Sequence, residues 1–249
     1  GGNVGIGTTS PAKPLHIYSA DNQPLRVEST DAYSGIELKD NGSSTLPPLI
    51  SALSDDFIFY GGHGSTRPAI MFMDSSTGNV GIGTTDPSAF NSRGQNLVVA
   101  GSGNVGITIN SDNTDSGTLL FSDGTGGTAA YRGIIEYDHS TDSMEFSTAA
   151  AERMRILSDG KVGIGTTSPG TKLSLEDSTS NGAVQISFKN DAREWRTGVH
   201  GGISDSFTLY DNTASATRLV VDSSGNVGIG STSPTSYNSN ADNLVIYEA

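Results

Sequence analysis

Gly78-Asn79-Val80-Gly81-Ile82-Gly83-Thr84-Thr85-Asp86-Pro87 is one of four copies of a ten-residue motif in this chain of 249 residues. The other copies begin at Gly2, Gly160 and Gly225, so consecutive copies start 76, 82 and 65 residues apart. These spacings are longer and less regular than those of helical or leucine-rich solenoids. We therefore interpret each repeat as a small multi-stranded module. A partial fifth copy occupies residues 103–107.

The motif itself has the pattern of a strand with one apolar and one nearly bare face. Val80 and Ile82 fall on one side, and Asn79, Gly81 and Gly83 on the other. Each glycine costs roughly 0.5–1 kcal/mol relative to alanine, so its use indicates close backbone approach. We expect a strand from a neighbouring unit or chain to pack on the glycine side, while Val80 and Ile82 fill a small shared core. The structural repeat residues are Gly78, Asn79, Val80, Gly81, Ile82, Gly83, Gly160, Val162, Gly163, Ile164, Gly165, Gly225, Val227, Gly228, Ile229 and Gly230.

Glycine-rich segments can also cradle phosphates, but the dinucleotide fingerprint has the order G-x-G-x-x-G and opens a helix. Here the order is G-x-x-G-x-G, followed by Thr-Thr-x-Pro. We therefore predict a construction element and no cofactor site.

Further strand-like segments follow each motif in a constant order. A short apolar segment comes first, and period-two alternation marks the segment after it. Three more segments lead back to the next motif, so we expect about five strands per unit. The predicted strands are 15–17, 97–99, 173–175 and 244–246; then 35–40, 117–123 and 184–191; then 49–53, 132–137 and 195–199; then 56–60, 143–146 and 206–210; and last 70–74, 153–157 and 218–222.

The motif copies divide the chain into repeat units. We predict the end of a preceding repeat at 1–11, complete units at 12–87, 88–169 and 170–234, and the start of a further repeat at 235–249. Because both ends fall inside this pattern, we expect the chain to be a piece of a longer polypeptide. The next leucine comes four or ten residues after the motif proline, and the two distances alternate along the chain, which predicts a two-unit super-repeat.

Composition indicates a thin core. Hydrophobic residues make up 34% of the chain, and glycine occupies 32 positions. Such a chain gains enough burial either by stacking its units or by sharing one interior among several chains. The predicted fold class is all-β: an elongated, fibrous array of small β-sheet modules, interwoven as a homotrimeric β-shaft.

Charge argues against nucleic acid as a partner, and the lengths of the apolar runs argue against a membrane. The net charge is −13 with only 14 Lys and Arg residues, so no basic patch for nucleic acid is expected. No apolar run approaches the roughly 20 residues of a membrane-spanning helix, and no signal segment is visible. We predict neither nucleic-acid binding nor membrane insertion. The chain has no cysteine, so neither disulfides nor thiolate metal sites are available.

The repeats, together with residues 151–156 running into Gly160, resemble those of tail fibres and other virion structural proteins of marine bacteriophages, especially cyanophages. The resemblance lies in the motif and spans the chain. It implies a slender homotrimeric shaft in the virion tail fibre, outside the cell. Implied partners are further copies of the chain, adjoining fibre segments and other virion proteins. Similar repeats in bacterial surface proteins keep an extracellular filament or adhesin stalk as an alternative.

Two segments of the sequence are candidates for ligand binding. Trp195, the single tryptophan, is flanked by arginines and is a candidate for stacking on a host glycan; filling the core of its unit is the alternative. The oxygen-rich loop 111–117 leaves calcium open, although it lacks the EF-hand spacing. Otherwise we predict no cofactor, and the four histidines show no metal-ligand spacing.

Catalysis is not predicted. The loop 61–67 suggests an oxyanion loop, but the sequence contains no G-x-S-x-G elbow. Carboxylate pairs such as Asp55/Asp56 and Glu136/Asp138 could serve a glycosidase. Acids in this chain fall mainly at strand ends and turns, where they bond local backbone. We therefore predict a structural shaft segment that presents a receptor-binding element, with a glycan-binding fibre region as the alternative.

Overall fold

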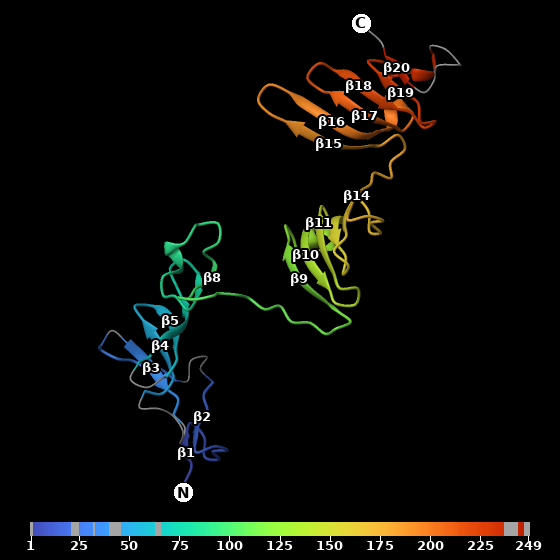
Figure 1. Cartoon of the computed structure of the whole chain (residues 1–249). Helices are drawn as coiled ribbons and strands as arrows, with labels where there is room; N and C mark the ends of the chain where they lie inside the picture. The colour runs from blue at the N-terminus through green and yellow to red at the C-terminus, as the bar shows by residue number, and fades with distance from the viewer. Residues whose placement is uncertain are drawn as a thin grey trace. The chain divides into compact units, whose positions relative to one another are not determined.

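The structure, a computed structural model, describes residues 2–20, 25–31, 33–39, 46–62 and 66–236, and the backbone of 244–246. The described chain is all-β and contains several small sheets. It divides into two compact units, residues 1–108 and 109–249. Figure 1 shows the three large sheets by colour: blue to green, green to yellow, and orange to red.

The first unit holds a strand pair and one six-stranded sheet. The pair is β1 (Val4–Ile6) with β2 (Leu15–Ile17). The first sheet consists of β3 (Tyr33–Glu37), β4 (Leu49–Leu53), β5 (Asp56–Tyr60), β6 (Ala69–Met73), β7 (Val80–Ile82) and β8 (Leu97–Val99).

The second unit holds two further six-stranded sheets. The second sheet consists of β9 (Ser116–Phe121), β10 (Gly133–Asp138), β11 (Ser143–Thr148), β12 (Ala151–Ile156), β13 (Val162–Ile164) and β14 (Leu173–Leu175). The third sheet consists of β15 (Ala183–Lys189), β16 (Glu194–His200), β17 (Ser206–Asp211), β18 (Ala216–Val221), β19 (Val227–Ile229) and β20 (Leu244–Ile246).

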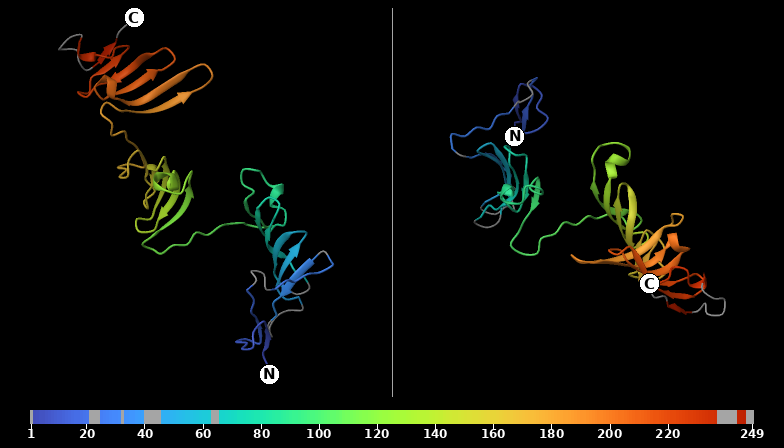
Figure 2. Two further views of the ribbon diagram at one scale, coloured as in Figure 1. Left: turned by 180° about the vertical axis from the view of Figure 1, so that it is seen from behind. Right: turned by 90° about the horizontal axis from the view of Figure 1, so that it is seen from above.

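All three sheets have the same topology. Their strands lie in sequence order, and Figure 2 shows the sheets from two further sides. The first five strands are antiparallel to their neighbours, and the sixth pairs in parallel with the fifth. Every strand predicted from the sequence is present, with ends that differ by at most three residues.

The count of about five strands per unit is one too low. The motif's three residues, such as Val80–Ile82, form a strand of their own, and the short apolar segment after it pairs with that strand in parallel. Val80 stands opposite Leu97, and Ile82 opposite Val99. Each sheet therefore closes on the strand after the motif, so the sheets and the sequence repeats do not share their boundaries.

A β-bulge recurs at the same place in each sheet. It lies between the third and fourth strands, at Phe59/Tyr60, Phe146/Ser147 and Leu209/Tyr210. A bulge bends its strand and increases the local right-handed twist. Its recurrence shows that the three modules share their backbone geometry as well as their strand order.

In the first and third sheets, the buried apolar side chains lie on the face that carries the middle glycine of the motif. In the first sheet, Ile58, Phe72 and Val98 follow one another in register on this face and are at most 7% exposed. Pro87, which ends the motif, is fully buried as well. In the third sheet, Val220 and Thr208 occupy the matching positions and are completely buried.

The partial fifth motif copy forms no strand. Residues 103–107 are exposed and follow β8 without pairing. They lack the Thr-Thr-x-Pro segment with which the full copies turn back. The short helices among the described residues are 3-10 turns, and none of them has the length and apolar character needed to cross a bilayer.

Candidate functional site

The first glycine of the motif makes the turn that enters it. Gly78 has φ +77°, and its N–H donates to the Asp74 carbonyl oxygen at 2.8 Å. The Asp74 carboxylate accepts hydrogen bonds from the Ser76 hydroxyl (2.6 Å) and the Ser76 and Thr77 backbone N–H groups. The bond from Ser76 is the main reason why the pKa of Asp74 lies below its ordinary value. Gly160 and Gly225 have the same left-handed conformation.

The second glycine is required by close contact within the motif. A Cβ atom on Gly81 would collide with the Thr84 carbonyl oxygen, and the same holds for Gly163 against Thr166. The motif proline lies close by, because Pro169 Cδ would be 3.4 Å from that atom. We expected a strand from a neighbouring unit or chain to pack against this glycine. The backbone that packs there belongs instead to the return loop of the same motif.

The third glycine starts the return loop. Gly83 has φ +74°, and a Cβ atom there would collide with the carbonyl oxygen of Ala100, directly after β8. Gly165 repeats this relationship with Glu176, at φ +76°. Both the backbone conformation and the space therefore exclude other residues.

In the first two copies, the motif asparagine ties the strand to its return loop, whereas Asn226 in the fourth copy donates to Asp222 in the turn before the strand. Asn79 is 1% exposed, and its Nδ2 donates to Ser88 Oγ at 3.3 Å. In the first copy, Asn3 Nδ2 donates to the Pro11 carbonyl oxygen at 3.0 Å. The motif thus works as a turn, a strand and an anchored return, and its side chains are used for structure.

Short and long joins lead to the same pairing. Eight residues separate β13 from β14, and fourteen separate β7 from β8. In both cases the motif valine stands opposite the following leucine. Each long join contains a 3-10 turn, Pro87–Ala89 or Pro234–Ser236, which accounts for part of its extra length.

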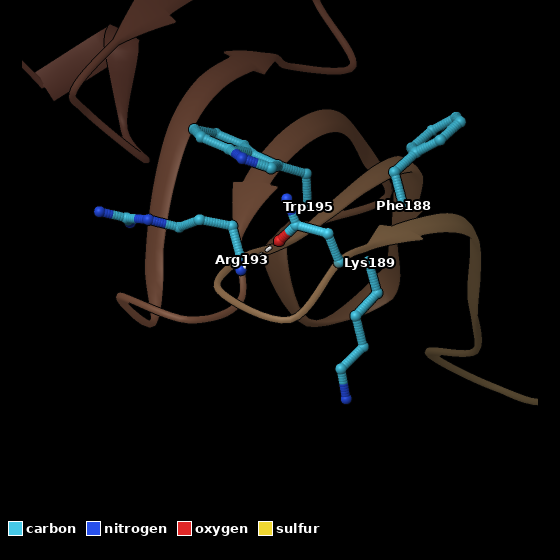
Figure 3. Close-up of a pocket in the computed structure, with 5 residues that line it drawn as sticks. Phe188, Lys189, Arg193 and Trp195 are labelled. Atoms are coloured by element: carbon cyan, nitrogen blue, oxygen red, sulfur yellow. Dashed lines mark hydrogen bonds between the residues drawn. The ribbon is translucent and has the colours of Figure 1, made fainter.

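Trp195, the candidate for glycan binding, is half-buried at the hairpin end of β15 and β16. It stands opposite Phe188 and Asp211 in the ladder, and it lines an open pocket of about 420 Å³ together with Phe188, Lys189, Asn190 and Arg193. Figure 3 shows Trp195 and Arg193 extending to the same side, whereas the ring of Phe188 points away from them. The Lys189 side chain extends to the opposite side in the same view, so the pocket offers one aromatic ring and the Arg193 guanidinium to a ligand.

A buried carboxylate beside this pocket was not predicted from the sequence. The Asp211 side chain is 1% exposed and forms ion pairs with Arg193 (2.9 Å) and Arg218 (3.0 Å). The Ala214 backbone N–H donates to it, which is the largest cause of the lowered pKa of Asp211. Its partners lie 18 and 7 residues away in the sequence. The sequence therefore indicated only an acidic residue at the end of a strand, and it did not indicate the ion pairs.

Most other acids considered from the sequence are engaged in turns. Asp138 accepts hydrogen bonds from the Ser140 hydroxyl and backbone N–H, and Asp56 accepts them from Ser75. Glu136 lies within β10. Asp55 has φ +76° in the turn between β4 and β5.

The remaining candidates give no assembled site. Arg67 of the loop 61–67 forms an ion pair with Glu37, while residues 63–65 lie outside the described residues. In the loop 111–117, the Asp112 carboxylate accepts a hydrogen bond from the Asn113 N–H. Within the described ranges, no three His, Asp or Glu side chains gather to hold a metal ion.

No protein-family model matches the chain, and no curated protein sequence matches it.

Proposed function

We propose that the chain is a structural shaft segment of a bacteriophage tail fibre. It assembles as a homotrimer in the extracellular part of the virion and carries a host-receptor-binding element away from the particle. The work of such a segment is mechanical, and it needs regular, rigid modules without an active centre.

The observation that carries this proposal is the threefold recurrence of one sheet. Strand order, the parallel last pair and the bulge are the same in β3–β8, β9–β14 and β15–β20. Repeated modules of one shape suit an extended support. The phage assignment rests on the likeness of the Gly-Asn-Val-Gly-Ile-Gly repeats to those of marine phage fibres. A bacterial surface filament is the alternative within the same mechanical class.

Two measurements test the proposal. Light scattering at concentrations down to the sub-micromolar range should give a stable mass of three chains, each of 25.7 kDa. A folded monomer would overturn the trimer. The genes next to the parent gene should encode virion proteins; a neighbourhood of bacterial secretion and cell-surface genes would favour the bacterial filament.

A second candidate function is host-glycan binding at the Trp195 pocket. The half-exposed indole and the neighbouring guanidinium of Arg193 favour it, since aromatic rings stack on apolar faces of sugars and cations bind acidic groups. A glycan array with the whole chain and with Trp195→Ala tests this function. Binding that Trp195→Ala abolishes would support it, and the absence of binding by the unmodified chain would reject it.

A further inference from the structure

One face of each sheet carries two apolar rows that run across all its strands. In the first sheet, the register aligns Ile36, Ile50, Phe59, Met71, Ile82 and Val99 in one row, and Ser34, Ala52, Phe57, Met73, Val80 and Leu97 in the other. We call these two rows, and their equivalents in the other sheets, the apolar stripe. Ser34 alone interrupts it, and no charged residue belongs to it.

The stripe recurs in the other two sheets. In the second sheet it consists of Leu119, Ile135, Phe146, Met154, Ile164 and Leu175, with Gly117, Tyr137, Met144, Ile156, Val162 and Leu173 beside them. In β15–β19 it consists of Ile186, Thr197, Leu209, Leu219 and Ile229, with Val184, Val199, Phe207, Val221 and Val227. The single non-apolar position is Gly117 in the second sheet and Thr197 in the third. Neither stripe contains a charged residue.

The opposite face does not keep its chemistry from sheet to sheet. Where the first sheet has Ile58 and Phe72, the second has Glu145 and Arg155. Arg155 forms ion pairs there with Glu145 (2.9 Å) and Glu152 (2.7 Å). The side chains on that face contact residues of the same module, so each module can use different residues there. The constant apolar character of the stripe points to a constraint that all modules share.

Much of the stripe is exposed in the single chain. Phe57 and Phe59 are 39% and 37% exposed, and Leu119 is 49% exposed. Two residue rows across six strands cover roughly 350 Å², and three stripes therefore cover about 1,000 Å². A standard protein interface buries about 800 Å² per partner. The stripes are thus large enough for stable association, and they lack charge as interface cores do.

We infer that the apolar stripe is the surface through which each sheet packs against the same sheet of other copies of this chain. An unrelated partner would have to match one pattern three times along the chain, whereas another copy supplies the three matching stripes by itself. This inference rests on the proposed homotrimeric shaft and names the contact face within it.

Leu119 and Leu120 allow a matched test. They are neighbours in β9 with 49% and 52% exposure, and they lie on opposite faces, because Leu119 is paired with Ile135 and Leu120 with Ile134. Leu119→Glu places a charge in the stripe, and Leu120→Glu places the same charge outside it. Light scattering on the whole chain should show at least a tenfold weaker association for Leu119→Glu, and unchanged association for Leu120→Glu.

Spin labels give a second measurement that does not depend on loss of assembly. The chain has no cysteine, so Leu119→Cys and Leu120→Cys each carry one label per chain, and any short-range dipolar broadening must come from another copy. Circular dichroism establishes that each variant is folded. We expect broadening at position 119, removed by dilution with unlabelled chain, and a narrow spectrum at position 120.

The outcomes separate this inference from the proposed function. An oligomer with a narrow spectrum at position 119, or with equal effects of both Glu variants, would overturn the stripe as the contact face and leave the oligomer standing. A two-chain mass with broadening at position 119 would keep the stripe and overturn the trimer. A folded monomer would overturn both.

Discussion

Val162 stands opposite Leu173 in a parallel pair of strands, although only ten residues lie between them. Parallel strands usually need a crossover of a dozen or more residues. The motif achieves the shorter connection because its strand is three residues long and its glycines allow the return loop to lie directly against it. The modules therefore depend on a few glycines.

Gly165→Ala should destabilise the chain by about 1–3 kcal/mol, because a residue with φ +76° would become strained. The added Cβ would also meet the Glu176 carbonyl oxygen. Gly170, in the same join, has no atom within 4 Å of an added Cβ, so Gly170→Ala is the control and should stay within about 0.5 kcal/mol. Urea unfolding measures both. Equal free energies of unfolding for the two variants would contradict the assigned role of Gly165.

Ile58→Ala should lower the free energy of unfolding by about 2–5 kcal/mol, since Ile58 is 1% exposed and its removal leaves a cavity. The control is Ile70→Ala in the neighbouring strand, where the side chain is 53% exposed, and the expected change is about 0.5 kcal/mol or less. Chemical denaturation followed by circular dichroism measures the difference. A larger effect at Ile70 than at Ile58 would contradict the assignment of Ile58 to the core.

Arg155→Ala should destabilise the second sheet by about 1–3 kcal/mol, because it leaves Glu145 and Glu152 facing each other without a cation. Arg26 pairs with Glu28 at the surface with a 79% exposed side chain, so Arg26→Ala should change stability by about 1 kcal/mol or less. Thermal unfolding of both variants at low and at high salt measures this. If high salt removed the effect of Arg155→Ala entirely, the ion pairs of Arg155 would contribute no more to stability than exposed surface pairs do, and the prediction would be wrong.

Acid should weaken the modules. The pKa of Asp222 is lowered from 3.8, mainly by the side-chain hydrogen bond from Asn226, and the pKa of Asp211 is lowered mainly by the Ala214 N–H. With a folded pKa below the unfolded one, each carboxylate contributes stability that is present above pH 3.8 and is lost as pH falls through the folded pKa. Urea midpoints between pH 7 and pH 2 should decrease below about pH 4.

Asp211→Asn tests one contributor to this acid sensitivity. It keeps the shape of the side chain but removes the charge that pairs with Arg193 and Arg218. We expect lower stability at pH 7 and a smaller further loss in acid than in the unmodified chain. An unchanged pH profile in this variant would mean that Asp211 contributes nothing to the dependence.

The strands could be predicted because their signals are local. Alternation of apolar and polar residues, and turn residues such as Asp74 and Gly78, marked every strand to within three residues. The parallel pairing of Val80 with Leu97 could not be predicted, since three-residue strands carry too little pattern to give a direction. The ion pairs of Asp211 were missed because its partners come from other strands.

The sequence alone determined that the chain is all-β and repetitive, because strand pattern and motif recurrence are properties of consecutive residues. Only the tertiary structure decided which face of each sheet is covered. The return loop after the motif lies against Gly81, and Asn79 is buried on the same side. Val80 and Ile82 therefore remain on the other side, within the stripe. Which of two faces a loop covers depends on where the chain turns in space, and no local pattern in the sequence records it.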